Sequence, residues 1–128
     1  MIKSLPFKKL LPFTSSFFKQ KNFLSILQDS SLTLSEEQLA IQKVALDFAN
    51  QKLSPYSAIW EEKHHFPVDV IKEAAQYGFG GIYTSSEYGG CGLKRVDASV
   101  IFEALAVGNV PISAYLTIHN MCCWIIDQ

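Results

Sequence analysis

The first 28 residues of this 128-residue chain contain no aspartate or glutamate. They carry five lysines, so this segment has a net charge of +5. Residues 29–128 hold the other six basic side chains and all twelve acidic ones, a net charge of −6. Because nucleic-acid phosphates repel an acidic body, nucleic-acid binding is disfavoured. The apolar content of 48% is high enough for one domain with a buried core.

Cysteine and histidine are scarce, and neither occurs at a metal-binding spacing. The cysteines are Cys91, Cys122 and Cys123, an odd number with two adjacent, which argues against a disulfide framework and favours a reducing compartment. Adjacent thiols lack the spacer that lets two of them reach one ion. We therefore expect no metal site and two small buried cysteines at 122 and 123. We expect His64 and His65 on a solvated helix face.

The acid-free N-terminus, residues 1–30, has the composition of a mitochondrial presequence. Its lysines respond to an inside-negative membrane potential, and its leucines and phenylalanines provide an apolar face for an import receptor. A secretory signal is disfavoured because Lys8, Lys9 and Pro12 interrupt the apolar runs. A disordered basic tail is the alternative, since presequences favour arginine and this segment has none. The segment is left out of the fold prediction in both cases.

Residues 31–128 have the pattern of successive amphipathic helices. Ser35 and Gln38 are spaced as a capping box at the first helix start. Apolar residues at helical spacing follow until Pro55, which ends the pattern. The same criteria predict further helices over residues 57–63, 67–76, about 97–107 and 111–126. The predicted fold class is all-α, with one glycine-rich loop between residues 78 and 92.

The last segment lacks charge, since residues 104–126 contain no aspartate, glutamate, lysine or arginine. This length could cross a membrane, but Gly108, Asn109 and Pro111 interrupt it and several polar side chains follow. We therefore expect no membrane span, and a helix apolar on most sides that its neighbours in this chain cover only in part. Asp127 opposes the dipole of this helix, so we expect the chain to stop in mid-structure.

A self-contained active site is not evident in these residues. His119 has no acidic partner nearby in sequence, and no serine has a nucleophile-elbow context, so a catalytic triad is unsupported. The glycines of residues 78–81 lack the GxGxxG spacing and do not lie between a strand and a helix, which disfavours a Rossmann dinucleotide site. The residues by themselves indicate a helical domain with one glycine-rich loop.

A series of segments resembles the N-terminal helical domain of the acyl-CoA dehydrogenases, over about residues 31–128. The resemblance is sharpest at residues 87–93, EYGGCGL, which is similar to the (E/D)YGGxGL loop of that family. The motif residues of this loop are Tyr88, Gly89, Gly90 and Gly92. Residues 66–70, 100–106 and 118–122 look most like the family member of valine degradation.

This resemblance implies a three-part flavoenzyme of which residues 31–128 are the N-terminal domain. Such an enzyme uses FAD to introduce an α,β double bond into a short, branched acyl-CoA and passes the electrons to electron-transferring flavoprotein. It also implies a homo-oligomer in the mitochondrial matrix, whose acyl-chain pocket includes Ser113, Tyr115 and His119. The glutamate base and the flavin contacts are expected beyond Gln128. We therefore expect no catalytic residue, no bound FAD and little activity in this chain alone.

Two other interpretations stay open. The chain can be a helical interaction module, or a splice fragment without catalysis, that pairs with full-length subunits through its uncovered faces. It can also be a nonfunctional fragment. A β-rich segment and a helical bundle further along the reading frame would favour the enzyme.

Overall fold

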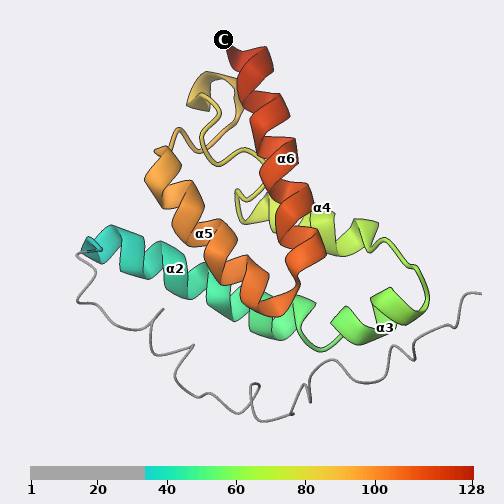
Figure 1. Cartoon of the computed structure of the whole chain (residues 1–128). Coiled ribbons are helices and arrows are strands. Elements are labelled where there is room, and N and C mark those ends of the chain that lie inside the picture. The colour runs from blue at the N-terminus through green and yellow to red at the C-terminus, as the bar shows by residue number, and fades with distance from the viewer. Residues whose placement is uncertain (1–33) are drawn as a thin grey trace, which may run out of the picture. The chain divides into compact units, whose positions relative to one another are not determined.

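The computed structural model describes residues 34–128, and this range contains helices and loops but no strand (Figure 1). The elements in chain order are α2 (Glu36–Phe48), the π-helix η3 (Ala49–Leu53), α3 (Ser57–Glu62), α4 (Val68–Gln76), the 3-10 helix η4 (Ser86–Tyr88), α5 (Arg95–Gly108) and α6 (Val110–Asp127). The predicted helical fold class is confirmed. The predicted presequence, residues 1–30, lies outside the described residues.

Helix α2 begins where its sequence predicts. The Gln38 backbone N donates to Ser35 Oγ at 3.2 Å, and the Ser35 backbone N donates to Gln38 Oε1 at 3.1 Å, which completes the capping box. The Gln38 Nε2 also donates to Asp97 Oδ1 at 2.8 Å. Because Asp97 lies in the first turn of α5, the cap of α2 ties the two helices together.

Helix α5 packs against α2, η3 and α6. Its last residue, Gly108, permits a close approach to η3, since a Cβ at this position would lie 2.6 Å from the Ala49 carbonyl oxygen. The shared apolar core consists of Ala45, Phe48, Ala49, Leu53, Ala74, Phe79, Ile82, Ala98, Ile101, Ala104, Leu105, Ile112 and Leu116. Residues of α2 and α5 recur in it at helical spacing, so each helix presents one apolar face to the same core.

Helix α6 begins at an asparagine cap. The Ile112 backbone N donates to Asn109 Oδ1 at 2.8 Å, and the Asn109 Nδ2 donates to Ser57 Oγ of α3 at 2.7 Å. Pro111 lies in the first turn, where its missing N–H costs no intrahelical hydrogen bond. Among the described residues, the helices are too short or too polar for one of them to traverse a bilayer.

Two predictions about cysteine and histidine are wrong. Cys122 is exposed and Cys123 is half-buried. The reason is that the buried face of α6 includes Asn120, and at about 100° per residue Cys122 is turned roughly 200° away from it. His64 and His65 are exposed, as predicted, but they are not on a helix. Because α3 ends at Glu62, His64 lies in a turn and His65 in the loop that follows.

Candidate functional site

The glycine-rich loop, residues 78–93, folds back on itself between α4 and α5. The backbone N–H groups of residues 91–93 donate to carbonyl oxygens of residues 81–84 at 2.8–2.9 Å. Gly90 has no room for a side chain, since a Cβ would lie 2.6 Å from the Thr84 carbonyl carbon. Gly89 has a φ of +82°, in the left-handed region that favours glycine. The two adjacent glycines of the motif are therefore required by the shape of the loop.

Two polar residues of α6 hold this loop in place. Asn120 is fully buried; its Oδ1 accepts from the Ile82 backbone N at 2.7 Å and its Nδ2 donates to the Phe79 carbonyl at 2.8 Å. Asp127 Oδ2 accepts from the Ser85 backbone N at 2.9 Å. These bonds pair loop N–H and C=O groups that face α6 rather than water.

The contacts of Asn120 and Asp127 with the loop were not predicted from the sequence. Their loop partners lie 38 to 42 residues earlier in the chain, and no short-range pattern connects them. One signal existed for Asn120, which lies four residues after Leu116 on the apolar face of a helix. A polar side chain at such a position needs a buried partner, so it indicates a long-range hydrogen bond without naming the other residue.

A hollow of about 320 Å³ opens between the loop and α6, and we call it the loop hollow. Its lining is Ala75, Gly78, Gly80, Gly81, Thr84, Tyr88, Gly89, Gly90, Cys91, His119 and Cys123. A second hollow of about 450 Å³, the end hollow, is lined by Thr84, Tyr88, Cys123, Ile126 and Asp127. The two hollows share Thr84, Tyr88 and Cys123, so they meet along one stretch of surface.

The structure brings His119 together with the loop motif. His119 lines the loop hollow with Tyr88, Gly89 and Gly90, whereas Gly92, at a φ of +62°, is outside the lining. Tyr88 is 74% exposed, so its ring lies at the rim of the hollow. A motif and a pocket residue that were predicted separately therefore share one surface.

The other two predicted pocket residues lie in different surroundings. The Tyr115 ring stacks against His119 and meets the Phe66 ring edge-on, with the Tyr115 and Phe66 centroids 4.9 Å apart. Ser113 is buried instead, and its Oγ donates to the Phe102 carbonyl of α5 at 2.8 Å. Tyr115 thus belongs to the exposed aromatic surface beside His119, whereas Ser113 belongs to the contact between α5 and α6.

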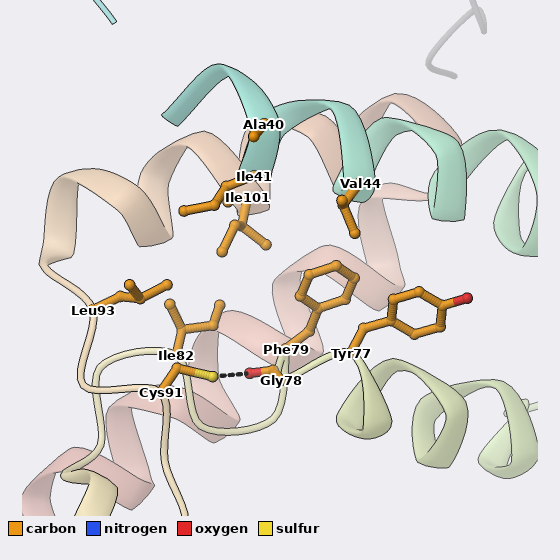
Figure 2. Close-up of a pocket in the computed structure, with 10 residues that line it drawn as sticks. All are labelled: Ala40, Ile41, Val44, Tyr77, Gly78, Phe79, Ile82, Cys91, Leu93 and Ile101. Atoms are coloured by element: carbon orange, nitrogen blue, oxygen red, sulfur yellow. Dashed lines mark hydrogen bonds between the residues drawn. The ribbon is translucent and has the colours of Figure 1, made fainter. Parts of the chain in front are cut away.

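A separate apolar hollow of about 230 Å³ opens between α2, the loop and α5 (Figure 2). Its lining is Ala40, Ile41, Val44, Tyr77, Gly78, Phe79, Ile82, Cys91, Leu93 and Ile101. The Cys91 Sγ lies 3.5 Å from the Gly78 carbonyl oxygen, to which it donates, as Figure 2 draws. Gly78 has a φ of +84°, and a Cβ there would lie 2.6 Å from this sulfur. The thiol fills the space that a side chain at residue 78 would need.

Charged side chains contribute little to these hollows. Arg95 stacks between Trp124 and Tyr83, with its guanidinium carbon 4.3 Å and 5.1 Å from the two ring centroids. Glu73 accepts a hydrogen bond from Lys52 at 2.8 Å, and this bond raises the pKa of the lysine. The pair joins α4 to η3 and lines none of the three hollows. Asp127 is the charged residue in the lining of the end hollow.

Metal-binding and cationic side chains are sparse around these hollows. In residues 34–128, no three histidine, cysteine or acidic side chains lie close enough to hold an ion. No lysine or arginine lines the loop hollow or the end hollow, so neither hollow supplies a cationic side chain for the pyrophosphate of FAD.

Residues 34–128 thus form a helical domain whose glycine-rich loop is held in place by α6. A family model described as acyl-CoA dehydrogenase, N-terminal domain, matches residues 35–128, and the chain belongs to this family. The resemblance found in the sequence is confirmed by this match.

The similar proteins are several times longer than this chain. Isobutyryl-CoA dehydrogenase, mitochondrial, of Bos taurus is 54% identical over 100 residues, which are 78% of this chain and 24% of that protein. The Dictyostelium discoideum protein of the same name is 45% identical over 114 residues, 89% of this chain and 27% of that protein. Glutaryl-CoA dehydrogenase of Desulfococcus multivorans is 29% identical over 93 residues, 70% of this chain and 24% of that protein. The chain thus spans about a quarter of the length of these relatives.

Proposed function

We propose that this chain is the N-terminal domain of an FAD-dependent acyl-CoA dehydrogenase that acts on a short, branched acyl-CoA in valine degradation. One observation carries the substrate class. The chain is 54% and 45% identical to two proteins named isobutyryl-CoA dehydrogenase, but 26–34% identical to six relatives with other names. A gap of this size between members of one family supports kinship with the isobutyryl-CoA dehydrogenases.

In this proposal, residues 31–128 supply one wall of the acyl-chain pocket and no reacting group. His119 and Tyr115 stack on each other beside the loop hollow, and they are the side chains proposed to contact the acyl chain. Ser113 acts indirectly, because its hydrogen bond to α5 fixes the turn of α6 that carries them. We propose that another part of the longer protein would carry the glutamate base and would hold FAD, which would supply the hydride acceptor for the dehydrogenation. Electron-transferring flavoprotein would be the partner that accepts the electrons.

We also propose that residues 1–30 are a presequence and that the protein works in the mitochondrial matrix as a homo-oligomer. Residues 1–28 have five lysines and no acid, and three relatives carry the word mitochondrial in their names. A fluorescent protein fused to residues 1–30 is expected to enter mitochondria. Replacing Lys8, Lys9 and Lys19 with glutamate should abolish import if the membrane potential drives it. A diffuse cytosolic signal from the unaltered fusion would contradict the proposal.

A helical interaction module without catalysis is the second candidate function. It is favoured by one feature, the exposed apolar side chains Ile118, Met121, Ile125 and Ile126 on α6. Such a surface suits a protein partner, including a full-length subunit of the same family.

The decisive experiment compares the purified 128-residue chain with the full translation product of its gene. We expect the longer protein to be yellow and to oxidise isobutyryl-CoA faster than n-butyryl-CoA with an artificial electron acceptor. We expect the 128-residue chain to be colourless and inactive. Preference for the straight-chain substrate would contradict the substrate class, and stoichiometric flavin on the short chain would contradict the division of roles. A gene that encodes nothing further would favour the interaction module.

A further inference from the structure

We propose that Cys123 is a site of covalent modification by α,β-unsaturated acyl thioesters, with His119 as the base that takes the thiol proton. The Cys123 Sγ lies 3.5 Å from the His119 Nε2, one turn earlier on α6. A thiol within hydrogen-bond reach of an imidazole can pass its proton to the ring and react as a thiolate.

The imidazole lies beside two aromatic rings. The Tyr115 ring runs parallel to the His119 ring, with centroids 6.4 Å apart and planes 9° apart. Tyr115 in turn meets the Phe66 ring edge-on at 4.9 Å. His119 is exposed, so its ring is open to the solvent as well as to the sulfur. A nucleophile and a base are therefore present on one accessible surface.

The other two cysteines lack this arrangement. The Cys91 Sγ faces the Gly78 carbonyl oxygen, which accepts a hydrogen bond but is not basic enough to remove the proton. Cys122 is exposed and has no hydrogen-bond partner within residues 34–128. Exposure alone would rank both of them above Cys123, which is half-buried. The position of His119 reverses that order.

The space in front of Cys123 suits a short acyl group. Cys123 lines both the loop hollow and the end hollow, which measure about 320 Å³ and 450 Å³. Thr84 lines both as well, and its Oγ1 has no hydrogen-bond partner among the described residues. The Oγ1 is enclosed, so the Thr84 side chain must turn toward the hollow to reach a ligand. Once turned, the hydroxyl would donate to the thioester carbonyl oxygen, where negative charge develops during addition to a conjugated double bond.

The choice of electrophile rests on the proposed function, since a dehydrogenase of this family produces an α,β-unsaturated thioester. In the step itself, the Cys123 Sγ forms a bond to the β-carbon, the carbon–carbon double bond is lost, and its electron pair moves to the carbonyl as an enolate. The proton taken by His119 then returns to the α-carbon. No atom leaves and no electron acceptor is needed, so the adduct has the summed mass of protein and thioester.

The test treats the 128-residue chain with the N-acetylcysteamine thioester of methacrylic acid and follows each cysteine by peptide mass spectrometry. The matched control is the saturated isobutyryl thioester, which cannot undergo the addition. We expect adduct at Cys123 before Cys91 and Cys122, and none with the saturated reagent. Because the reagent already carries the double bond, the result does not depend on dehydrogenase activity. A chain that fails the dehydrogenase assay can thus still be modified at Cys123, so the two proposals can fail separately.

Two variants sharpen the assignment. His119→Gln should slow modification of Cys123 about tenfold while Cys91 and Cys122 react at their former rates. Unfolding would instead bring all three cysteines to one common rate, so the two unaltered thiols report whether the variant is folded. Thr84→Val should slow the thioester reaction several-fold without slowing alkylation of Cys123 by iodoacetamide, because only the former develops an enolate.

Three results would overturn the proposal. The first is equal modification of Cys91 or Cys122 by the thioester. The second is an unchanged rate at Cys123 in folded His119→Gln. The third is a product whose mass shows that the carrier thiol has been lost, which would mean acyl transfer to Cys123 and not addition.

Discussion

Helices α5 and α6 follow each other in the chain and are both rich in apolar residues, yet they bury different shares of them. Helix α5 buries Ala98, Val100, Ile101, Ala104, Leu105 and Gly108. Helix α6 is longer but buries only Ile112, Ser113, Leu116 and Asn120. The difference arises because α5 packs against α2, η3 and α6, whereas α6 has its main helix contact with α5 alone. Apolar composition makes burial favourable, but the number of neighbouring elements decides how much of it occurs.

The exposed side of α6 confirms the expected uncovered surface. Ile125 is 64% exposed and Ile126 is 86% exposed, and Ile118 and Met121 lie on the same helix with about half of their surface or more in water. These side chains therefore add less from burial to the stability of residues 34–128 than fully buried ones do. They make α6 the part of the described chain best suited to contact another protein surface.

The largest effect is expected when alanine replaces an apolar residue on the buried side of α6 and not on its exposed side. Leu116→Ala should lower the free energy of unfolding by about 3 kcal/mol, because Leu116 is 1% exposed and its loss leaves a cavity. Ile125→Ala should change it by less than about 0.5 kcal/mol. Urea unfolding of the 128-residue chain, followed by circular dichroism, measures both. Equal losses would show that the outer side of α6 is buried in solution.

The next effect concerns the hydrogen bonds that tie the loop to α6. Asn120→Ala should cost about 2 kcal/mol, because the Ile82 N–H and the Phe79 carbonyl lose their buried partner. Asn50→Ala is the control, since Asn50 is exposed and should be neutral. Amide hydrogen exchange at Ile82 should speed up in the first variant only. Unchanged exchange would mean that the loop holds its shape without α6.

Close packing at the end of α5 predicts a loss of stability on substitution that is equal to or smaller than that of Asn120→Ala. Gly108→Ala should destabilise by about 1–2 kcal/mol, because the added methyl meets Ala49 and Leu53 and outweighs the better helix propensity of alanine. Gly92→Ala is the matched control; it has open space and only the strain of a φ of +62°. Thermal melts compare the two. A stabilised Gly108→Ala variant would contradict the close approach of α5 to η3.

The smallest predicted effect is the pH dependence of the Lys52–Glu73 pair. The pKa of Lys52 is raised above the ordinary 10.5 by its hydrogen bond to Glu73. The pair therefore stabilises the fold below that pH, and this stability is lost as the pH rises through the raised pKa. Glu73→Gln should therefore lower the unfolding midpoint slightly at about pH 8 and leave it unchanged at about pH 12. The pair is partly exposed, so this change in stability should be the smallest of the four predicted here. A difference that persists at the higher pH would point to packing, not charge.

The parts of the fold that depend on neighbours in sequence were predicted well. The capping box at Ser35 needs only residues three apart, and the end of the first helical stretch before Pro55 needs only the proline itself. The predicted helix boundaries were less accurate where a side-chain hydrogen bond extends a helix beyond its apolar pattern. Helix α5 begins at Arg95, before the predicted start near Asp97, because the Asp97 carboxylate caps the Lys94 N–H from inside the first turn.

The candidate site divides in the same way. The glycine motif was visible as a string, since its glycines satisfy a local backbone requirement. Four residues of α6 hold the loop or line the hollow beside it: Asn120, Asp127, His119 and Cys123. Helix α5 separates α6 from the loop in the chain, and no periodicity links the two segments. Ser113 shows the converse, because the family resemblance placed it in the acyl-chain pocket, whereas its hydrogen bond turns it toward α5.

The sequence by itself determined the helical class, the start of α2 and the family of this protein, because capping, apolar spacing and the YGGxGL string are properties of adjacent residues. Only the tertiary structure decided which apolar side chains are covered and which polar groups meet. Burial of Leu116 and exposure of Ile125 differ although both are apolar residues of one helix. Burial depends on what packs from elsewhere in the chain, and that information is carried by long-range contacts, which the local pattern does not contain.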